Sequence, residues 1–202
     1  MDYAYEVLER HTLCRSFLRL EAYRLRHRLF AGGWSAEMIR DCLERGQAVA
    51  VLPYDPVRDR VVLIEQFRVG ALRAPVAHPW LLEIVAGEIG AGETPEQVAR
   101  REAEEEAGCR LTTLEPICQY LVSPGSSAEW VHLFVGRIDS TGIGGLHGLD
   151  EEHEDIRVET VDREQALADL AEGRIVASPA IIALQWLALN GTALRRRWWP
   201  KG

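Results

Sequence analysis

Three glutamates near the middle of the chain, Glu102, Glu105 and Glu106, have a spacing at which side chains act together. Helical residues three and four positions apart lie on one face, with β-carbons about 5–6 Å apart. Carboxylates this close repel one another, and either solvent or a cation must relieve the repulsion. Carboxylate oxygens are ligands that Mg²⁺ and Mn²⁺ prefer, often together with a substrate's phosphates. The spacing therefore indicates either a divalent-cation site or a solvated acidic helix face.

A helix over residues 95–107 is expected to carry these glutamates. Its start and its end have recognisable signals: an N-cap residue at Thr94, a proline at the first helical position, Gln97 three residues after the cap, and Gly108 as the stop. A glycine-rich loop over residues 87–92 leads into the helix. The sequence thus predicts a tight loop followed directly by a capped, carboxylate-bearing helix.

The remaining patterns predict a mixed α and β fold. Two apolar, β-branched stretches at 48–54 and 60–67 flank a turn-rich connection and are typical of a hairpin. Further strands are expected over 80–86, 115–122, 130–138 and 155–161. Two more helices are expected, one over 163–172 capped by Asp162, and one from Ser178-Pro179 to Asn190-Gly191. Strands predominate before the C-terminal helices.

The first 46 residues give a weaker pattern. Residues 17–30 fit either an alternating strand or a helix, and the recurrence of Phe, Tyr and Leu without good caps favours a strand. If this segment lies outside the compact fold, its apolar residues need a partner surface. We therefore expect residues 1–46 to form a dimerisation segment and residues 47–202 the main domain.

Composition excludes several classes of protein. With 202 residues, 47% of them hydrophobic, and a net charge of −8, the chain is expected to fold as a globular protein without a nucleic-acid partner. No apolar run approaches the roughly 18 residues of a membrane span, and the first residues lack a secretory pattern, so we expect a cytoplasmic protein without a membrane partner. The 4 cysteines have no metal-ligand spacing and are expected to be reduced thiols.

The glutamates also belong to a longer pattern. Gly87, Glu93, Arg101-Glu102, Glu105-Glu106 and Gly108 match every fixed letter of the Nudix box, GX5EX7REUXEEXGU. Its two apolar positions hold the small residues Ala103 and Cys109. The box covers only 23 residues, but the sequence resembles the Nudix hydrolase superfamily at every position that defines it.

This resemblance implies an α+β Nudix fold, in which a mixed β-sheet is sandwiched between helices. It also implies a hydrolase of nucleoside diphosphate derivatives that uses Mg²⁺, with Mn²⁺ possible. By carry-over onto matching positions, Glu102, Glu105 and Glu106 are expected to be metal ligands, and Arg101 is expected to orient the glutamates. The carbonyl of Ala86 is implied as a further metal ligand.

Segments outside the box narrow the resemblance to bacterial ADP-ribose pyrophosphatases. These segments are LLEIVAGEI before the box, LIEQFR at 63–68 and GLHGLDEEHEDIRV at 145–158. The resemblance implies a homodimer that hydrolyses ADP-ribose to AMP and ribose 5-phosphate. Glu152, in the acidic loop after the box, is implied as the general base, with Glu151 as the alternative, and Glu154 is implied as another metal ligand.

Four residues are implied as contacts to the nucleotide sugar: Phe17, Arg40, Arg68 and Glu129. Each also has an ordinary interpretation, as a core or interface residue, a surface ion-pair partner or a solvated loop residue. Two other functions stay open, a Nudix hydrolase of GDP-mannose or dinucleoside polyphosphates, and a non-catalytic ADP-ribose sensor. The intact glutamates and Arg101 count against a sensor, because a binder does not need them all.

Overall fold

The computed structural model describes residues 3–149, 151 and 153–199, which form two compact units. Unit 1 extends to Gln47 and also includes Tyr120–Val131. Unit 2 consists of Ala48–Gln119 and the residues from His132 onward. Among the described residues, no helix has both the length and the apolar character needed to cross a membrane.

Unit 1 is built on a three-stranded antiparallel sheet in the order β1-β2-β3, formed by β1 (Tyr5–Arg15), β2 (Arg19–His27) and β3 (Met38–Glu44). The strand interpretation of residues 17–30 is therefore confirmed over β2, whereas β1 and β3 were not predicted as separate strands. Large apolar side chains remain exposed on unit 1: Tyr3, Tyr5, Phe17, Phe30 and Ile39. An exposed apolar surface of this kind is typical of a protein interface.

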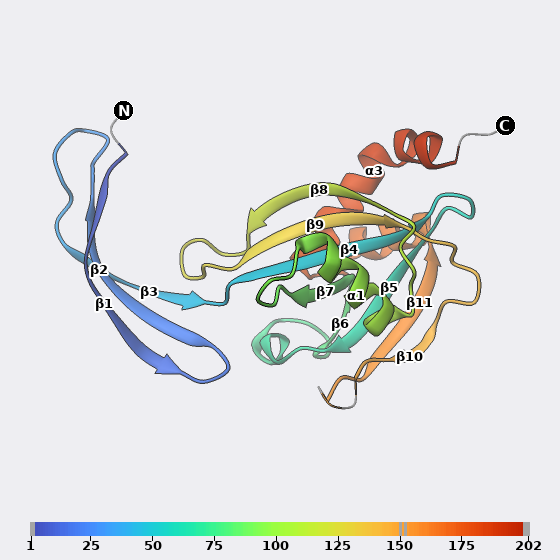
Figure 1. The fold of residues 1–202 in the computed structure, drawn as a ribbon, viewed down its shortest axis with the longest axis horizontal. Helices are drawn as coiled ribbons and strands as arrows, with labels where there is room; N and C mark the ends of the chain where they lie inside the picture. Colours follow the sequence, from blue (N-terminus) through green and yellow to red (C-terminus); the bar gives the residue numbers. More distant parts are fainter. Residues whose placement is uncertain (1–2, 150, 152, 200–202) are drawn as a thin grey trace. The chain divides into compact units, whose positions relative to one another are not determined.

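Unit 2 contains most of the residues of a larger sheet (Figure 1). Its order is β10-β11-β5-β4-β9-β8, and β6 and β7 pair with β5 and β4 respectively. The strands are β4 (Gln47–Asp55), β5 (Arg60–Phe67), β6 (Trp80–Glu83), β7 (Val85–Glu88), β8 (Thr113–Leu121), β9 (Trp130–Arg137), β10 (Gly145–His147) and β11 (Ile156–Asp162). A short 3₁₀ helix, η1 (Val69–Arg73), follows β5. The predicted hairpin of β4 and β5 is confirmed.

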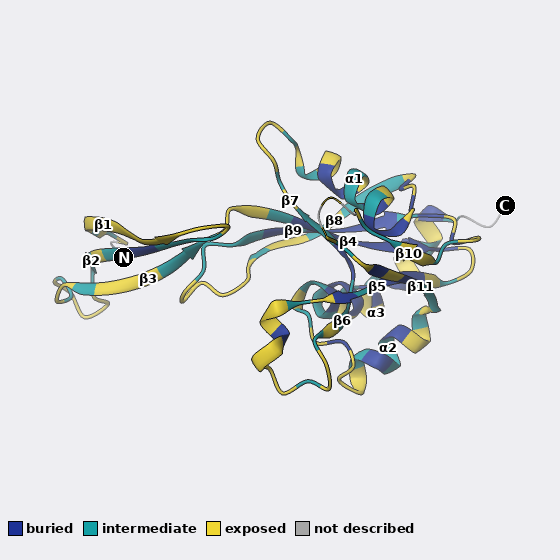
Figure 2. Cartoon of the chain, turned by 90° about the horizontal axis from the view of Figure 1, so that it is seen from below, coloured by how far each residue is buried: buried dark blue, intermediate teal, exposed yellow. Residues whose placement is uncertain are grey.

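Helices cover both faces of this sheet in unit 2 (Figure 2). α1 (Pro95–Ala107) lies on one face, and α2 (Arg163–Ala171) and α3 (Ser178–Trp198) lie on the other. Between α1 and the sheet is a core of aliphatic side chains that includes Val49, Val51, Val62, Ile64, Val85, Val98 and Ala103. Since β4 and β5 are buried on both faces, they are almost continuously apolar in sequence. The predicted sheet between helices is confirmed.

Two boundary predictions were wrong, and the predicted N-cap of α2 lacks its side-chain bond. The strand expected over 80–86 is divided at Ile84, because β6 pairs with β5 while β7 pairs with β4. α3 continues through Gly191 to Trp198, since Gly191 is buried on the same face as Leu187 and Leu194. Asp162 occupies the N-cap position of α2, but its carboxylate accepts a hydrogen bond from Arg60 and makes no cap bond.

The turn between β4 and β5 is organised by Asp55, a fully buried carboxylate. Its Oδ1 accepts the backbone N–H groups of Val57 (2.8 Å) and Arg58 (3.0 Å), and its Oδ2 accepts the N–H and hydroxyl of Ser140 (3.0 and 2.7 Å). Although burial favours the neutral acid, these bonds and the Arg58 guanidinium hold the pKa of Asp55 below its usual range. Asp55 thus ties the turn to the segment after β9.

We expect Asp55→Ala to lower the free energy of unfolding by about 3 kcal/mol at pH 7, since it leaves buried donors without an acceptor. A carboxyl whose pKa is lowered by folding stabilises the protein above its unfolded pKa of about 4, and this contribution is lost as the pH falls through the folded value. The difference between wild type and Asp55→Asn, measured by urea unfolding, should therefore shrink below about pH 4. Exposed Asp139, which also contacts Arg58, provides the control: Asp139→Ala should lower the free energy of unfolding much less than Asp55→Ala does. Equal losses at the two aspartates would contradict this role for Asp55.

Candidate active site

Helix α1 presents glutamates along one edge of its buried face. The helix begins with a complete capping box between Thr94 and Gln97 and ends at Gly108, whose φ of 61° is left-handed, as the sequence predicts. Val98, Ala99, Ala103 and Ala107 point into the core. Because Glu106 follows this buried face, its side chain is also almost completely buried, with 2% of its surface exposed.

Strand β7 lies directly against the two innermost glutamates. The backbone N–H of Ala86 donates to Glu106 Oε2 at 2.9 Å. A β-carbon at Gly87 would lie only 1.9 Å from Glu102 Oε1, so the carboxylate occupies the space that any other residue would fill. A side chain at position 87 would therefore displace the Glu102 carboxylate, and the carboxylates of Glu102 and Glu106 both face the β7 backbone.

Arg101 connects the carboxylates of this region. Its Nη1 contacts Glu102 Oε1 at 2.8 Å and Glu105 Oε2 at 2.9 Å, and its Nε contacts Glu93 Oε1 at 3.1 Å. Glu93 also accepts the backbone N–H of Gly90 at 2.9 Å, which fixes the loop before the helix. The guanidinium thus holds Glu102, Glu105 and Glu93 through charge-assisted bonds.

Glu93 and Glu83 pair with Arg101 and Arg68 respectively, and the sequence analysis assigned neither glutamate to the site. Arg68, at the end of β5, contacts Glu83 of β6 at 2.7 Å. The signal for Glu83 was available, because an acidic residue inside the apolar segment 80–86 requires a partner. The positive charge of Arg68 also favours the charged form of Glu106.

The environment of Glu102 and Glu106 opposes their ionisation. Burial raises the pKa of Glu106 to about 8, and the charges of Glu102 and Glu154 add to this effect, while the N–H of Ala86 acts against it. Burial likewise raises the pKa of Glu102 to about 7; Arg101 opposes the change, and Glu105 and Glu154 reinforce it. The two carboxylates share a poorly solvated region, and the positive charge near them is too small to keep both ionised at neutral pH.

An oxygen-preferring divalent cation fits this donor set. Among the described residues, no three His, Cys, Asp or Glu side chains are close enough to hold a metal ion. Glu106 lies beside the Ala86 peptide and Glu102 lies beside Gly87, while Arg101 holds both Glu102 and Glu105. A cation at the pair would supply the charge that the protein environment lacks, and would favour the ionised carboxylates.

The other predicted site residues lie in different places. Glu154 belongs to the turn before β11, where its N–H donates to Leu149 O at 3.2 Å, and its charge acts on Glu102 and Glu106. Glu151 is exposed, and Glu152 lies outside the described residues. Phe17, Arg40 and Glu129 belong to unit 1, in the β1–β2 turn, in β3 and in the β8–β9 segment respectively.

Within unit 1, Phe17, Arg40 and Glu129 have few polar contacts among the described residues. Phe17 is 86% exposed. Arg40 donates to the carbonyl oxygen of Ile39 at 2.8 Å, and Glu129 lies 3.8 Å from Arg45. No buried core position explains Phe17, which leaves an aromatic side chain available for a ligand or for a protein interface.

Comparisons with known proteins agree with the motif and the fold. The sequence model of the NUDIX domain matches residues 44–181. An ADP-ribose pyrophosphatase of Escherichia coli (strain K12) is 50% identical, with 96% of this chain and 92% of that protein covered. An ADP-ribose pyrophosphatase of Haemophilus influenzae is 47% identical, with 96% and 90% covered. A crystal structure of an ADP compounds hydrolase matches with a TM-score of 0.66 and 21% identity, covering 93% of this chain and 96% of that chain, and it supports the fold alone.

Glu106 should destabilise the metal-free protein at alkaline pH. Its folded pKa of about 8 exceeds an unfolded value of about 4.3, so the folded state favours the protonated carboxyl. Relative to the ionised form, this preference stabilises the fold fully below about pH 4 and is lost as the pH rises through about 8. In the presence of a chelator at pH 8.5, Glu106→Gln should therefore raise the free energy of unfolding by about 1–2 kcal/mol, which corresponds to a few degrees in Tm. The gain should be smaller at pH 5. Exposed Glu104→Gln, on the same helix, should change neither value by more than about 0.5 kcal/mol, and a lower Tm for Glu106→Gln at pH 8.5 would refute the pKa assignment.

Proposed function

This chain belongs to the Nudix family, and on that premise we propose that it hydrolyses the pyrophosphate bond of ADP-ribose to give AMP and ribose 5-phosphate. The observation that carries the proposal is the pair of buried Glu106 and partly buried Glu102, the latter against Gly87, in an intact Nudix box. Relatives that carry the name ADP-ribose pyrophosphatase support the substrate, since they align over nearly the whole chain at 47–50% identity.

Nudix hydrolases need a divalent metal, and we propose Mg²⁺ for this chain, with Mn²⁺ as an alternative. Glu102 and Glu106 would hold it together with the carbonyl of Ala86, and Glu105 and Glu154 would complete the ligand set. When bound, the cation supplies charge that screens the phosphates and activates water. The hard oxygen donors of the site suit either ion.

The chain's own residues would then orient the reactants. Arg101 fixes Glu102 and Glu105 through its guanidinium, so their carboxylates are positioned before the substrate arrives. Arg68 offers donors that can bind phosphate oxygens in an otherwise acidic protein. Phe17 would contact the adenine, while Arg40 and Glu129 would bind the phosphates and the terminal ribose. In this proposal Arg40 comes from the second subunit of a homodimer.

A carboxylate in the acidic loop would accept the proton of the attacking water. We propose Glu152 for this role, with Glu151 as the alternative. Turnover of Glu151→Gln and Glu152→Gln, compared at saturating substrate and metal, distinguishes them: loss of the general base should lower kcat by about 10²–10⁴-fold. A larger loss in Glu151→Gln would assign the base to Glu151.

The activity is tested by measuring AMP release from ADP-ribose, GDP-mannose and diadenosine tetraphosphate, each with Mg²⁺ and with a chelator. We expect AMP from ADP-ribose only with metal, and a loss of at least about 10²-fold in turnover for Glu106→Gln, because the cation loses a ligand. Glu104→Gln, exposed on the same helix, should keep turnover within about twofold of wild type.

Each other outcome identifies a different function. Turnover of GDP-mannose or the dinucleoside alone would retain the metal-dependent chemistry but contradict the ADP-ribose assignment. Tight binding of ADP-ribose without turnover of any compound would contradict hydrolysis and favour a sensor. Full turnover in Glu106→Gln would contradict the proposed site.

We also propose that unit 1 forms a homodimer through its exposed apolar surface. Light scattering at micromolar concentration should give about twice the 22.7 kDa mass of the chain. Ile39→Glu, which places a charge at a 64% exposed position of β3, should weaken the dimer, whereas Leu189→Glu, at an 86% exposed position of α3, should leave it intact. A monomeric mass for the wild type would overturn the proposal.

A further inference from the structure

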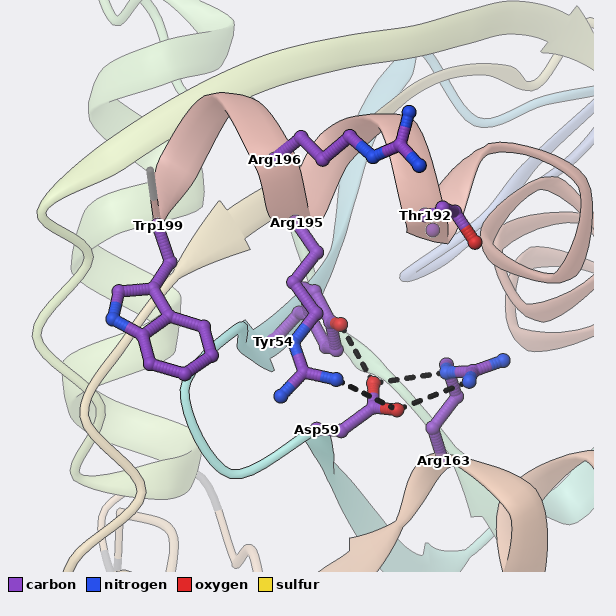
Figure 3. A pocket seen from close by; sticks show the side chains of 8 residues that line it. Tyr54, Asp59, Arg163, Thr192, Arg195, Arg196 and Trp199 are labelled. Atoms are coloured by element: carbon purple, nitrogen blue, oxygen red, sulfur yellow. Dashed lines mark hydrogen bonds and ion pairs between the residues drawn. The ribbon is translucent and has the colours of Figure 1, made fainter. Parts of the chain in front are cut away.

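A cavity lined partly by charged side chains lies within unit 2, on the face of the sheet that α2 and α3 cover (Figure 3). Its volume is about 560 Å³, which is within the usual range for small-molecule sites. Side chains from four segments line it: Tyr54 of β4, Asp59 of the following turn, Arg163 at the start of α2, and Thr192, Arg195, Arg196 and Trp199 at the end of α3. None of these residues has a role in the proposed hydrolysis.

Asp59, the only acidic residue among the described residues of this lining, is already paired with positive charge. Its carboxylate accepts the Tyr54 hydroxyl at 2.7 Å and two guanidinium bonds from Arg163, at 2.9 and 3.0 Å. Arg195 Nη1 lies 3.7 Å from the same carboxylate. Figure 3 shows these groups meeting at Asp59. Because Tyr54, Arg163 and Arg195 all surround this carboxylate, its negative charge is balanced locally and does not make the cavity negative.

The arginines of the cavity outnumber this single carboxylate. Arg195 is also used structurally, since it donates to the carbonyl oxygens of Pro56 (2.6 Å) and Val57 (3.1 Å) and lies over the Trp199 ring at 5.2 Å. Arg163 uses Nε and Nη2 for Asp59, and its Nη1 has no hydrogen-bond partner among the described residues. Arg196 is exposed and forms no ion pair within that part of the chain. The cavity therefore has excess positive charge in a protein whose net charge is −8.

The favourable interaction of cations with the C-terminal end of α3 accounts for only part of this cluster of arginines. Cations in the last turn of a helix interact favourably with its negative end, and Arg195, Arg196 and Arg197 all stand there. Arg197, however, points elsewhere and pairs with Glu115 at 2.6 Å. Arg196 and Thr192 are four residues apart, so they share one face of α3, and both line the cavity with Arg163. The helix dipole explains cations at this end, but it does not explain why Arg196 and Thr192 line the same cavity as Arg163.

We propose that this cavity binds the phosphate group of a small phosphorylated metabolite, with Arg196, Thr192 and Arg163 as its hydrogen-bond donors. A guanidinium can bind two phosphate oxygens at once, and a hydroxyl can donate to a third. The binding is separate from the carboxylates of α1, and it needs no metal. The remaining volume accommodates the sugar or nucleoside that carries the phosphate.

The test is a titration of the full-length protein in chelator at constant ionic strength, with inorganic phosphate, ribose 5-phosphate and AMP as separate probes. The readout is the indole N–H resonance of Trp199, assigned with Trp199→Phe, because that side chain lines the cavity. We expect a saturable shift in the wild type. Arg196→Gln should weaken the affinity at least tenfold, and Thr192→Val should weaken it severalfold. Similar affinities for phosphate and its monoesters would identify the free anion as the ligand, whereas tighter monoester binding would show contacts to the sugar or nucleoside.

Arg197→Gln is the matched control, since it removes the same charge from the adjacent residue outside the cavity. Its affinity should stay within twofold of wild type, and the Tm of each variant reports whether it remains folded. Equal losses in Arg196→Gln and Arg197→Gln would show a general charge effect and overturn the proposal. The absence of a saturable Trp199 shift with every probe would also overturn it. Neither result depends on turnover of ADP-ribose, so the hydrolysis proposal is tested separately.

Discussion

The burial of two carboxylates against a strand backbone is the constraint on which the rest of this structure depends. Glu106 is almost inaccessible to solvent, and Glu102 occupies space left by Gly87, so each carboxylate loses much of its hydration. The cost appears as pKa values of about 8 and about 7, well above those of exposed glutamates. In a metal-free protein these carboxylates oppose folding at alkaline pH, and a divalent cation bound as proposed would convert the same carboxylates into stabilising ligands.

The surrounding elements make that unfavourable arrangement possible. The aliphatic core between α1 and the sheet fixes the helix, the capping box fixes its start, and Arg101 restrains the more exposed glutamates. A buried polar site of this kind reduces stability where function requires charge, so substitutions that relieve the repulsion should stabilise the protein and abolish activity together. The electrostatic cost at Glu106 is thus evidence of a binding site, whereas an exposed acidic helix face would show no such pKa change.

Local patterns predicted much of the fold but little of its three-dimensional contacts. The helix over 95–107 follows from Thr94, Gln97 and Gly108, because caps act within a few residues. The division of residues 80–86 into β6 and β7 depends on pairing with two different strands, and the continuation of α3 depends on packing around Gly191. Neither has a local signal. The box likewise indicated Glu102 and Glu106, but the Arg68–Glu83 pair and the arginine-lined cavity join segments distant in sequence.

Proton release on metal binding is the most direct test of the central claim, that buried and partly protonated carboxylates form the cation site. Calorimetric titration with Mg²⁺ at pH 7, repeated in buffers of different ionisation enthalpy, gives the number of protons released. The raised pKa values of Glu106 and Glu102 predict net release from the wild type, less release from Glu106→Gln, and declining release as the pH rises above 8. Metal binding at pH 7 without proton release would contradict the account, because the carboxylates would then be fully ionised before the cation arrives.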